Sequence, residues 1–171
     1  AIEGKENVQR VYVSGTTGKN NITLTSCDFL TAKTAVYSNA DGEINVENCS
    51  FTGSAAPVNI NHKTSGTVTV NVSNCTFDNC GDTGEWKEFA APIRLVQSDA
   101  AGSMTAAVGN ATFTNTTGDN GDILLGDGRA NENSDNTKIT ATVTNTNANV
   151  QAQKPGYYKE NGESDVDKVT K

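Results

Sequence analysis

The chain has 171 residues, is 35% hydrophobic and carries a formal net charge of -7 at pH 7. This length suffices for one domain with a buried core, and the acidic balance disfavours binding to the phosphate backbone of a nucleic acid. No apolar run approaches the roughly 18 residues that cross a bilayer, so we expect neither nucleic-acid binding nor membrane insertion. The 23 Thr and 21 Asn residues favour short strands joined by polar turns over helices.

One pattern recurs along the chain. In each copy, aliphatic and polar residues alternate, and then come Ser or Asn, a small apolar residue, a spacer and Phe. After a first expected strand at 8–13, the copies occupy residues 22–29, 44–51, 67–77 and 106–113. Each copy is followed by a shorter expected strand, at 35–37, 58–60, 93–96 and 123–125. A degraded fifth copy at 139–150 has Ala148 and Val150 in the places of Cys and Phe.

The repeat predicts a stacked architecture. The Phe positions, 29, 51, 77 and 113, lie 22, 26 and 36 residues apart, and repeats of a few tens of residues are typical of solenoids. One repeat cannot bury its own apolar face, so successive repeats must stack. Asn tolerates the left-handed backbone region, so we expect bends at Ser26, Asn48, Asn74 and Asn110. The expected inward columns are Ile22, Ile44 and Val70; Leu24, Val46, Val72 and Val108; Cys27, Cys49, Cys75 and Ala111; and Phe29, Phe51, Phe77 and Phe113.

The pattern aliphatic-x-aliphatic-x-x-Cys/Ala-x-Phe, with a preceding Asn, resembles that of the right-handed parallel β-helix. Pectate lyases, polygalacturonases, phage tailspikes and many bacterial adhesins have this fold. The resemblance covers roughly residues 8–150 and implies an all-β solenoid of about five irregular coils. We expect a single β-helix domain at residues 1–150, with 151–171 as a C-terminal cap or linker tail. An antiparallel β-sandwich is the alternative, because short strands at even spacing also produce one.

The four cysteines do not form a metal motif. Cys27, Cys49 and Cys75 hold equivalent repeat positions, so we expect a column of buried thiols that pack as small apolar groups. Cys80 lies off the repeat and is expected to be the most exposed thiol. The chain has no C-x2-C pair and its single His is elsewhere, so zinc is not expected.

The family resemblance suggests where catalytic residues would lie. Pectate lyases hold calcium with Asp side chains and use an Arg as base, which here would correspond to Arg94 with Asp119, Asp122 and Asp127. Arg94 alternates with two aliphatic residues and is expected to point outward as a surface side chain. The polygalacturonase motifs N-T-D, D-D, G-H-G and R-I-K are absent. The loop acids could bind calcium through oxygen, but turn chemistry explains the same residues, so no cofactor is expected.

Trp86 is the only Trp and lies in the longest inserted loop. An exposed aromatic could stack on a sugar or anchor a partner, and a buried one would cover the core. Together with Arg94, Asp119, Asp122 and Asp127, it forms the expected ligand-binding set, because loops on a rigid scaffold carry function.

These observations predict a non-catalytic module of a secreted or cell-surface bacterial protein. It would act as a spacer or adhesin-like binding surface toward a polysaccharide, a surface glycan, or a host or cell-wall protein. The alternative is a polysaccharide lyase or glycoside hydrolase, which would need convergent acids or a calcium cluster beside Arg94. A purely structural stalk is the third reading, and the expected location is extracellular or at the cell surface.

Overall fold

The structure is a computed structural model that describes residues 2–3, 9–15, 18–31, 33–82, 84, 87, 90–99, 101–126 and 138–152. Within these ranges the regular structure consists of β-strands without an α-helix, and every strand pairing is parallel. The predicted all-β class is therefore confirmed, and the antiparallel sandwich is wrong. No helix in the described part of the chain is long and apolar enough to cross a membrane.

The strands form three parallel sheets. Sheet A contains β1 (Ile2–Glu3), β4 (Asp28–Leu30), β7 (Ser50–Thr52), β10 (Thr76–Asp78) and β13 (Thr112–Thr114). Sheet B contains β2 (Gln9–Val13), β5 (Thr34–Ser38), β8 (Val58–His62), β11 (Ile93–Gln97), β14 (Ile123–Leu125) and β16 (Val150–Ala152). Sheet C contains β3 (Asn20–Thr25), β6 (Gly42–Glu47), β9 (Thr67–Ser73), β12 (Ser103–Gly109) and β15 (Ile139–Thr144).

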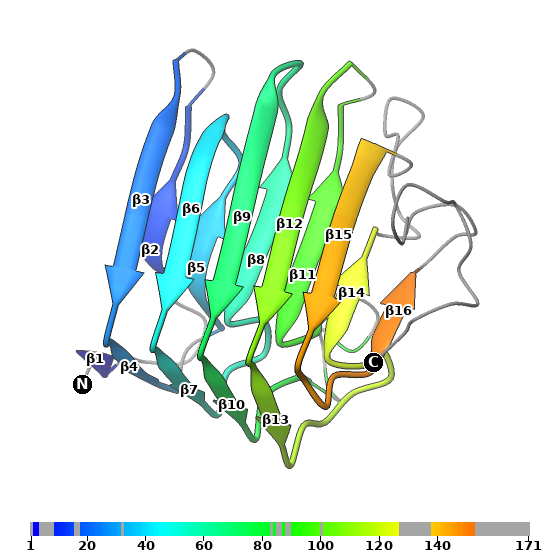
Figure 1. The fold of residues 1–171 in the computed structure, drawn as a ribbon. Coiled ribbons are helices and arrows are strands. Elements are labelled where there is room, and N and C mark those ends of the chain that lie inside the picture. Colours follow the sequence, from blue (N-terminus) through cyan, green and yellow to red (C-terminus); the bar gives the residue numbers. More distant parts are fainter. Residues whose placement is uncertain are drawn as a thin grey trace.

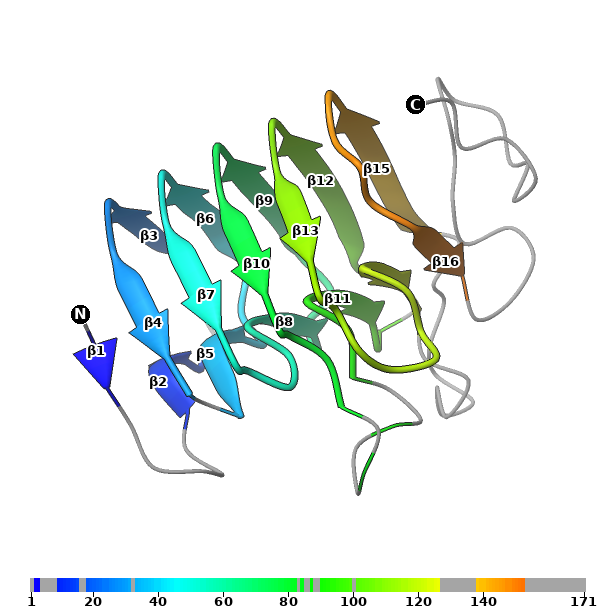
Figure 2. The ribbon, with the colours of Figure 1, turned by 90° about the horizontal axis from the view of Figure 1, so that it is seen from below.

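From β3 onward the chain visits sheets C, A and B in turn. We call one such passage a circuit, so the circuits are β3–β5, β6–β8, β9–β11 and β12–β14. Figure 1 shows the strands of sheet C side by side from β3 to β15, with sheet B behind them. Figure 2 shows sheet A stacking in the same order, from β1 to β13. Parallel strands stacked in three sheets are compatible with a β-helix.

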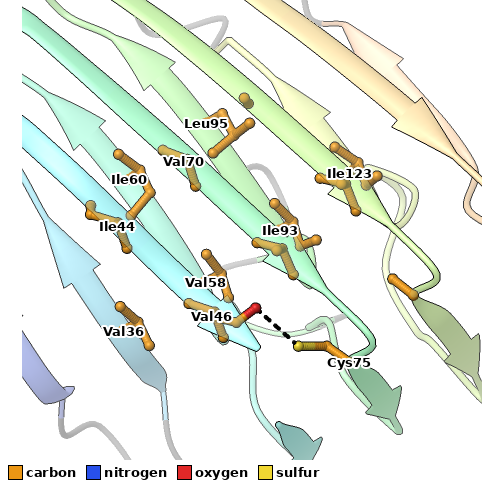
Figure 3. Close-up of a cluster of buried hydrophobic side chains, with 14 of the residues drawn as sticks. Val36, Ile44, Val46, Val58, Ile60, Val70, Cys75, Ile93, Leu95 and Ile123 are labelled. Atoms are coloured by element: carbon orange, nitrogen blue, oxygen red, sulfur yellow. Dashed lines mark hydrogen bonds between the residues drawn. The ribbon is translucent and has the colours of Figure 1, made fainter. Parts of the chain in front are cut away.

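Equivalent residues of successive circuits lie in register, as the repeat predicts. Phe29, Phe51, Phe77 and Phe113 form one column, and their rings stack at centroid distances of 5.2, 4.9 and 4.8 Å. Sheet C contributes two further columns, which begin at Ile22 and Leu24. Figure 3 shows aliphatic side chains of sheets B and C meeting in the core, with the Cys75 thiol donating to the Val46 carbonyl at 3.5 Å.

The bend residues confirm the predicted backbone. At the corner between sheets C and A, positive φ angles of 57°, 52°, 52° and 52° occur in succession at Ser26, Asn48, Asn74 and Asn110. The corner between sheets A and B has a second such series, with positive φ at Thr31, Gly53, Asn79 and Asn115. Residues with a Cβ rarely adopt a positive φ, and Asn does so at a lower conformational energy cost than most other residues.

The predicted alignment of the fifth copy is wrong after its first strand. Val150 lies in β16 of sheet B, paired with Ile123, and not in the Phe column of sheet A. In place of a strand beside β13, the Asn147 side chain accepts from the Phe113 amide at 2.9 Å and donates to the Phe113 carbonyl at 2.7 Å. The amide side chain thus replaces a strand at the edge of sheet A. Of the predicted tail, 151–171, nearly all lies outside the described residues.

Candidate functional site

The five residues predicted to bind a ligand do not form one described site. Trp86 and Asp127 lie outside the described residues. Asp119 is exposed on the link between β13 and β14. Arg94 and Asp122 are nearly buried, with 6% and 7% exposure, and each makes a hydrogen bond to a neighbouring circuit.

Arg94 lies on the outer face of sheet B, as its alternation predicts, because its neighbours Ile93 and Leu95 belong to the core. It is nevertheless buried, so the expectation of a solvated surface side chain is wrong. Its Nη1 donates to Asn59 Oδ1 at 2.9 Å, and Asn59 is its register partner on β8. This hydrogen bond ties two adjacent circuits together.

Two polar side chains on the link after β13, Asp122 and Asn120, hydrogen-bond to backbone groups. Asp122 Oδ2 accepts from the backbone amide of Asn149 at 2.7 Å. Asn120 Nδ2 donates to the carbonyls of Lys87 and Ala90, at 2.7 and 3.1 Å. Within the described ranges, no group of three or more His, Cys, Asp or Glu side chains is placed to hold a metal ion.

Cys27, Cys49 and Cys75 form the predicted apolar column. Cys49 and Cys75 are buried and Cys27 is half-buried. Cys80, expected to be the most exposed thiol, is in fact fully buried, and its thiol donates to the Phe51 carbonyl at 3.5 Å. Burial raises the pKa of the Cys75 and Cys80 thiols to about 11, so both are poor nucleophiles.

An outward column on sheet B presents two tyrosines. Tyr12 and Tyr37 are register partners on β2 and β5. Their rings stack at a centroid distance of 5.1 Å and an angle of 5°. Tyr12 is 56% exposed and is the one large hydrophobic side chain exposed in the described part of the chain. We call Tyr12 and Tyr37 the tyrosine pair.

Polar side chains lie beside Tyr37 on sheet B. Asn61 hydrogen-bonds to Tyr37 and accepts from Ser98 Oγ at 2.6 Å. Burial, and then the neighbouring Tyr12, raise the pKa of Tyr37, and they outweigh Arg94 and the Asn61 hydrogen bond, which lower it. The Tyr37 hydroxyl is therefore neutral at neutral pH. The pair thus offers an aromatic surface bordered by amide and hydroxyl groups, with the nearly buried guanidinium of Arg94 close to Tyr37.

A second polar group occupies the corner between sheets B and C. We call it the corner cluster, and it comprises Asp41, His62, Thr64 and Gln97. His62 is fully buried, and its ring nitrogens lie 2.8 Å from Gln97 Oε1 and 2.8 Å from Asp41 Oδ1. Thr64 Oγ1 lies 2.8 Å from His62 Nε2 and donates to Asp41 Oδ1. Asp41 remains 24% exposed, so the cluster reaches the surface.

Neither the tyrosine pair nor the corner cluster was predicted from the sequence. The tyrosine pair had a signal, since Tyr12 follows Val11 as Tyr37 follows Val36, and the register could have been inferred from the Phe column. The corner cluster had none, because its members lie at the ends of β8 and β11 and on two separate links. No family model, no curated protein and no solved structure matches the chain.

Proposed function

We propose that the chain is a right-handed parallel β-helix that serves as a non-catalytic binding module of a secreted or cell-surface bacterial protein. Its ligand is a polysaccharide or surface glycan, and the tyrosine pair is the binding surface. The β-helix is supported by the recurrence of sheets C, A and B and by the Phe column.

One observation carries the proposed ligand class, and that is the exposed Tyr12 ring stacked on the half-buried Tyr37 ring. Tyr12 is 56% exposed, and Tyr combines an apolar ring with a polar hydroxyl, so the ring can pack against a ligand while the hydroxyl stays hydrated. A sugar ring has the matching character, with C–H groups on its face and hydroxyls at its rim. Stacking on Tyr37 holds the Tyr12 ring in one orientation, which lowers the entropy lost on binding.

A binding role fits the polar residues better than catalysis does. Arg94 is held by Asn59 and is nearly buried, and Asp122 accepts from a backbone amide. Both side chains therefore contribute to the packing of adjacent circuits. Glycoside hydrolysis would require two carboxyl groups about 5–10 Å apart across an open groove.

Affinity electrophoresis against a panel of plant, microbial and host polysaccharides tests the proposal. It is run with and without calcium, and released products are measured in the same samples. We expect retardation by at least one polysaccharide without product release. The affinity of the Tyr12→Ala variant for that polysaccharide should be lower by a factor of about ten or more. The Tyr12→Trp variant should retain binding.

The matched control is Thr105→Ala, an exposed side chain on the outer face of sheet C, which should bind as the wild type does. Equal retardation of Tyr12→Ala and the wild type would refute the assigned surface. Absence of retardation across the panel would refute the ligand class, and product release would favour the lyase or hydrolase.

A further inference from the structure

Sheet C ends one strand earlier than sheets A and B at the N-terminal end of the stack. β1 pairs with β4 in sheet A, and β2 pairs with β5 in sheet B. In sheet C the corresponding position, beside β3, holds no strand among the described residues, since β3 pairs only with β6. Figure 1 shows β3 at the outer edge of its sheet. We call the side of β3 that faces away from β6, at residues 20–25, the open edge.

The apolar core is incompletely covered at the open edge. Ile44 and Val46 of β6 are 1% and 0% exposed. Their register partners on β3, Ile22 and Leu24, are only half-buried, and so is Cys27. Because the same columns run through both strands, the greater exposure on β3 reflects a neighbour on one side only. A further strand in register would bury Ile22 and Leu24, as β9 buries their partners on β6.

The backbone of β3 directs hydrogen-bonding groups at the open edge. In a parallel sheet, alternate residues direct their N–H and C=O groups to opposite neighbours. The Asn20 and Ser26 amides donate to the carbonyls of Asp41 and Glu47, at 2.9 and 3.0 Å, so the even-numbered residues of β3 face β6. The backbone groups of residues 21, 23 and 25 therefore face the open edge.

β3 lacks the features that keep an edge strand from pairing. Natural edge strands are commonly protected by charged side chains, by proline or by a bulge. The six residues N-N-I-T-L-T include neither a charged residue nor a proline, and their register with β6 is continuous. By contrast β6, inside the sheet, contains Glu43 and Glu47. An unprotected edge of this kind accepts an extended peptide by strand addition.

We infer that the open edge binds one extended segment of a second polypeptide, which adds to sheet C as a parallel strand beside β3. The columns define its chemistry, since it must place aliphatic side chains opposite Ile22 and Leu24. The residues between them are polar and not acidic, because the chain carries a net charge of -7. β1 and β2 already occupy sheets A and B at this level, so the open edge accepts a single strand.

The end of a second copy of the folded chain does not fit this edge. At the C-terminal end of the stack, β15 pairs with β12 and β16 pairs with β14, so sheets C and B end at the same level. If β15 of a second copy lay beside β3, β16 of that copy would occupy the place of β2, which pairs with β5. The partner is therefore a short extended segment rather than the end of another stack.

A peptide with the sequence of residues 67–73, T-V-T-V-N-V-S, extended by one lysine for solubility, is the probe. It has the required alternation, since Val70 and Val72 occupy the columns of Ile22 and Leu24. In an amide-shift titration of the labelled protein, we expect saturable shifts at residues 20–25 and slower hydrogen exchange at the amides of 21, 23 and 25. Residues 139–144 should not shift. A control peptide with Val70→Asn and Val72→Asn should bind about tenfold or more weakly, because it offers no aliphatic side chains to the core.

Variants of the protein test the hydrogen bonds of the added strand. Thr23→Pro removes one N–H from the open edge and no hydrogen bond to β6, and proline is tolerated on edge strands. Its affinity for the peptide should fall about tenfold or more, with circular dichroism as the check that it folds. Thr23→Ala keeps the N–H and should bind as the wild type does. Tyr12→Ala should also bind the peptide normally, which separates this surface from the tyrosine pair.

Three results would overturn the inference. The first is a titration without shifts at residues 20–25. The second is equal binding of the two peptides, or equal binding of the probe by folded Thr23→Pro and Thr23→Ala. The third is concentration-dependent dimerisation of the protein alone, measured by sedimentation and accompanied by shifts at residues 20–25, which would assign the open edge to a second copy.

Discussion

Phe51 and Phe77 stack across adjacent circuits, with ring centroids 4.9 Å apart and planes inclined by 12°. Both rings are almost fully buried. Each circuit thus supplies one ring to a continuous column, and the column couples neighbouring circuits through direct contact between equivalent side chains. Since the Phe column passes through four circuits, its interior members should be the most sensitive positions in the core.

Replacement of Phe77 by Ala should lower the free energy of unfolding by about 3–5 kcal/mol, because it removes a buried ring and leaves a cavity between Phe51 and Phe113. Phe77→Leu should cost less, since it refills part of that volume. Urea unfolding followed by circular dichroism measures both. Thr105→Ala, on the exposed face of sheet C, is the control and should change stability by less than about 0.5 kcal/mol. Equal effects of Phe77→Ala and the control would contradict the stacked core.

Asn74 tests the bends. Its φ is 52° and its side chain is exposed. The backbone conformation, rather than a buried contact, should therefore determine which residue types are tolerated at this position. Asn74→Ala should destabilise by about 1 kcal/mol, and Asn74→Gly should be close to neutral, because glycine adopts this region freely. Thermal unfolding of the two variants provides the comparison. A larger loss for Gly than for Ala would contradict the assigned backbone.

The buried thiols give a prediction for alkaline pH. In the unfolded chain they ionise from about pH 9, whereas in the folded chain burial raises the pKa of Cys75 and Cys80 to about 11. The folded chain therefore binds more protons in this window, so the free energy of unfolding should fall as the pH rises from 9 to 11. Cys75→Ala introduces the residue type that the fourth circuit has at the equivalent position, Ala111. In this variant the free energy of unfolding should fall by about 1–2 kcal/mol less than in the wild type over the same pH range.

Alkylation supplies an independent measurement of the same thiols. With iodoacetamide at pH 8, Cys27, which is half-buried, should be modified first, and Cys75 and Cys80 only after unfolding. Peptide mass spectrometry locates each label. Modification of Cys80 in the folded protein at the rate of Cys27 would show that its corner is open.

Asn147 should act as a cap on the last strand of sheet A. Asn147→Ala removes both hydrogen bonds to Phe113 and should destabilise by about 1 kcal/mol. It should also accelerate hydrogen exchange of the Phe113 amide. Asn147→Asp is the sharper variant, because it keeps the acceptor and loses the donor. In Asn147→Asp the Phe113 amide should stay protected from hydrogen exchange near neutral pH. Unchanged exchange of this amide in Asn147→Ala would contradict the role of Asn147 as a cap.

The sequence predicted the parts of the fold that repeat. In-register stacking brings equivalent positions into contact, so a column requires similar side chains in every circuit, as the Phe column and the aliphatic columns of sheet C show. Positive φ limits the choice at the bends to a few residue types, which made Asn48 and Asn74 recognisable.

The parts that failed are those where the chain departs from its repeat. Val150 was misplaced because the Asn147 side chain replaces a strand of sheet A, and no residue pattern distinguishes a capping amide from a turn amide. Cys80 appeared exposed because it follows the repeat, but the corners of adjacent circuits cover it, as the hydrogen bond from Gly81 to Ser54 shows. The alternation of Arg94 with its aliphatic neighbours predicted the correct face of sheet B. Alternation carries no information on whether other side chains bury the residues on that face.

The candidate site was the least predictable part. The sequence directed attention to loop acids and the single Trp, whereas the described surface features lie on strands and at a corner. The corner cluster joins residues 21 to 35 positions apart, such as Asp41, His62 and Gln97. Only the stacking register brings these side chains together, so no local motif could reveal them.

The most direct test of the account is an amide-shift titration of the labelled protein with an oligosaccharide cut from whichever polysaccharide retards it. We expect saturable shifts at residues 11–13 and 36–38 and their neighbours at 59–61, no shifts on the outer face of sheet C, and an intact oligosaccharide at the end. Shifts confined to residues 118–126, or cleavage of the oligosaccharide, would contradict the proposal of a non-catalytic glycan-binding module at the tyrosine pair.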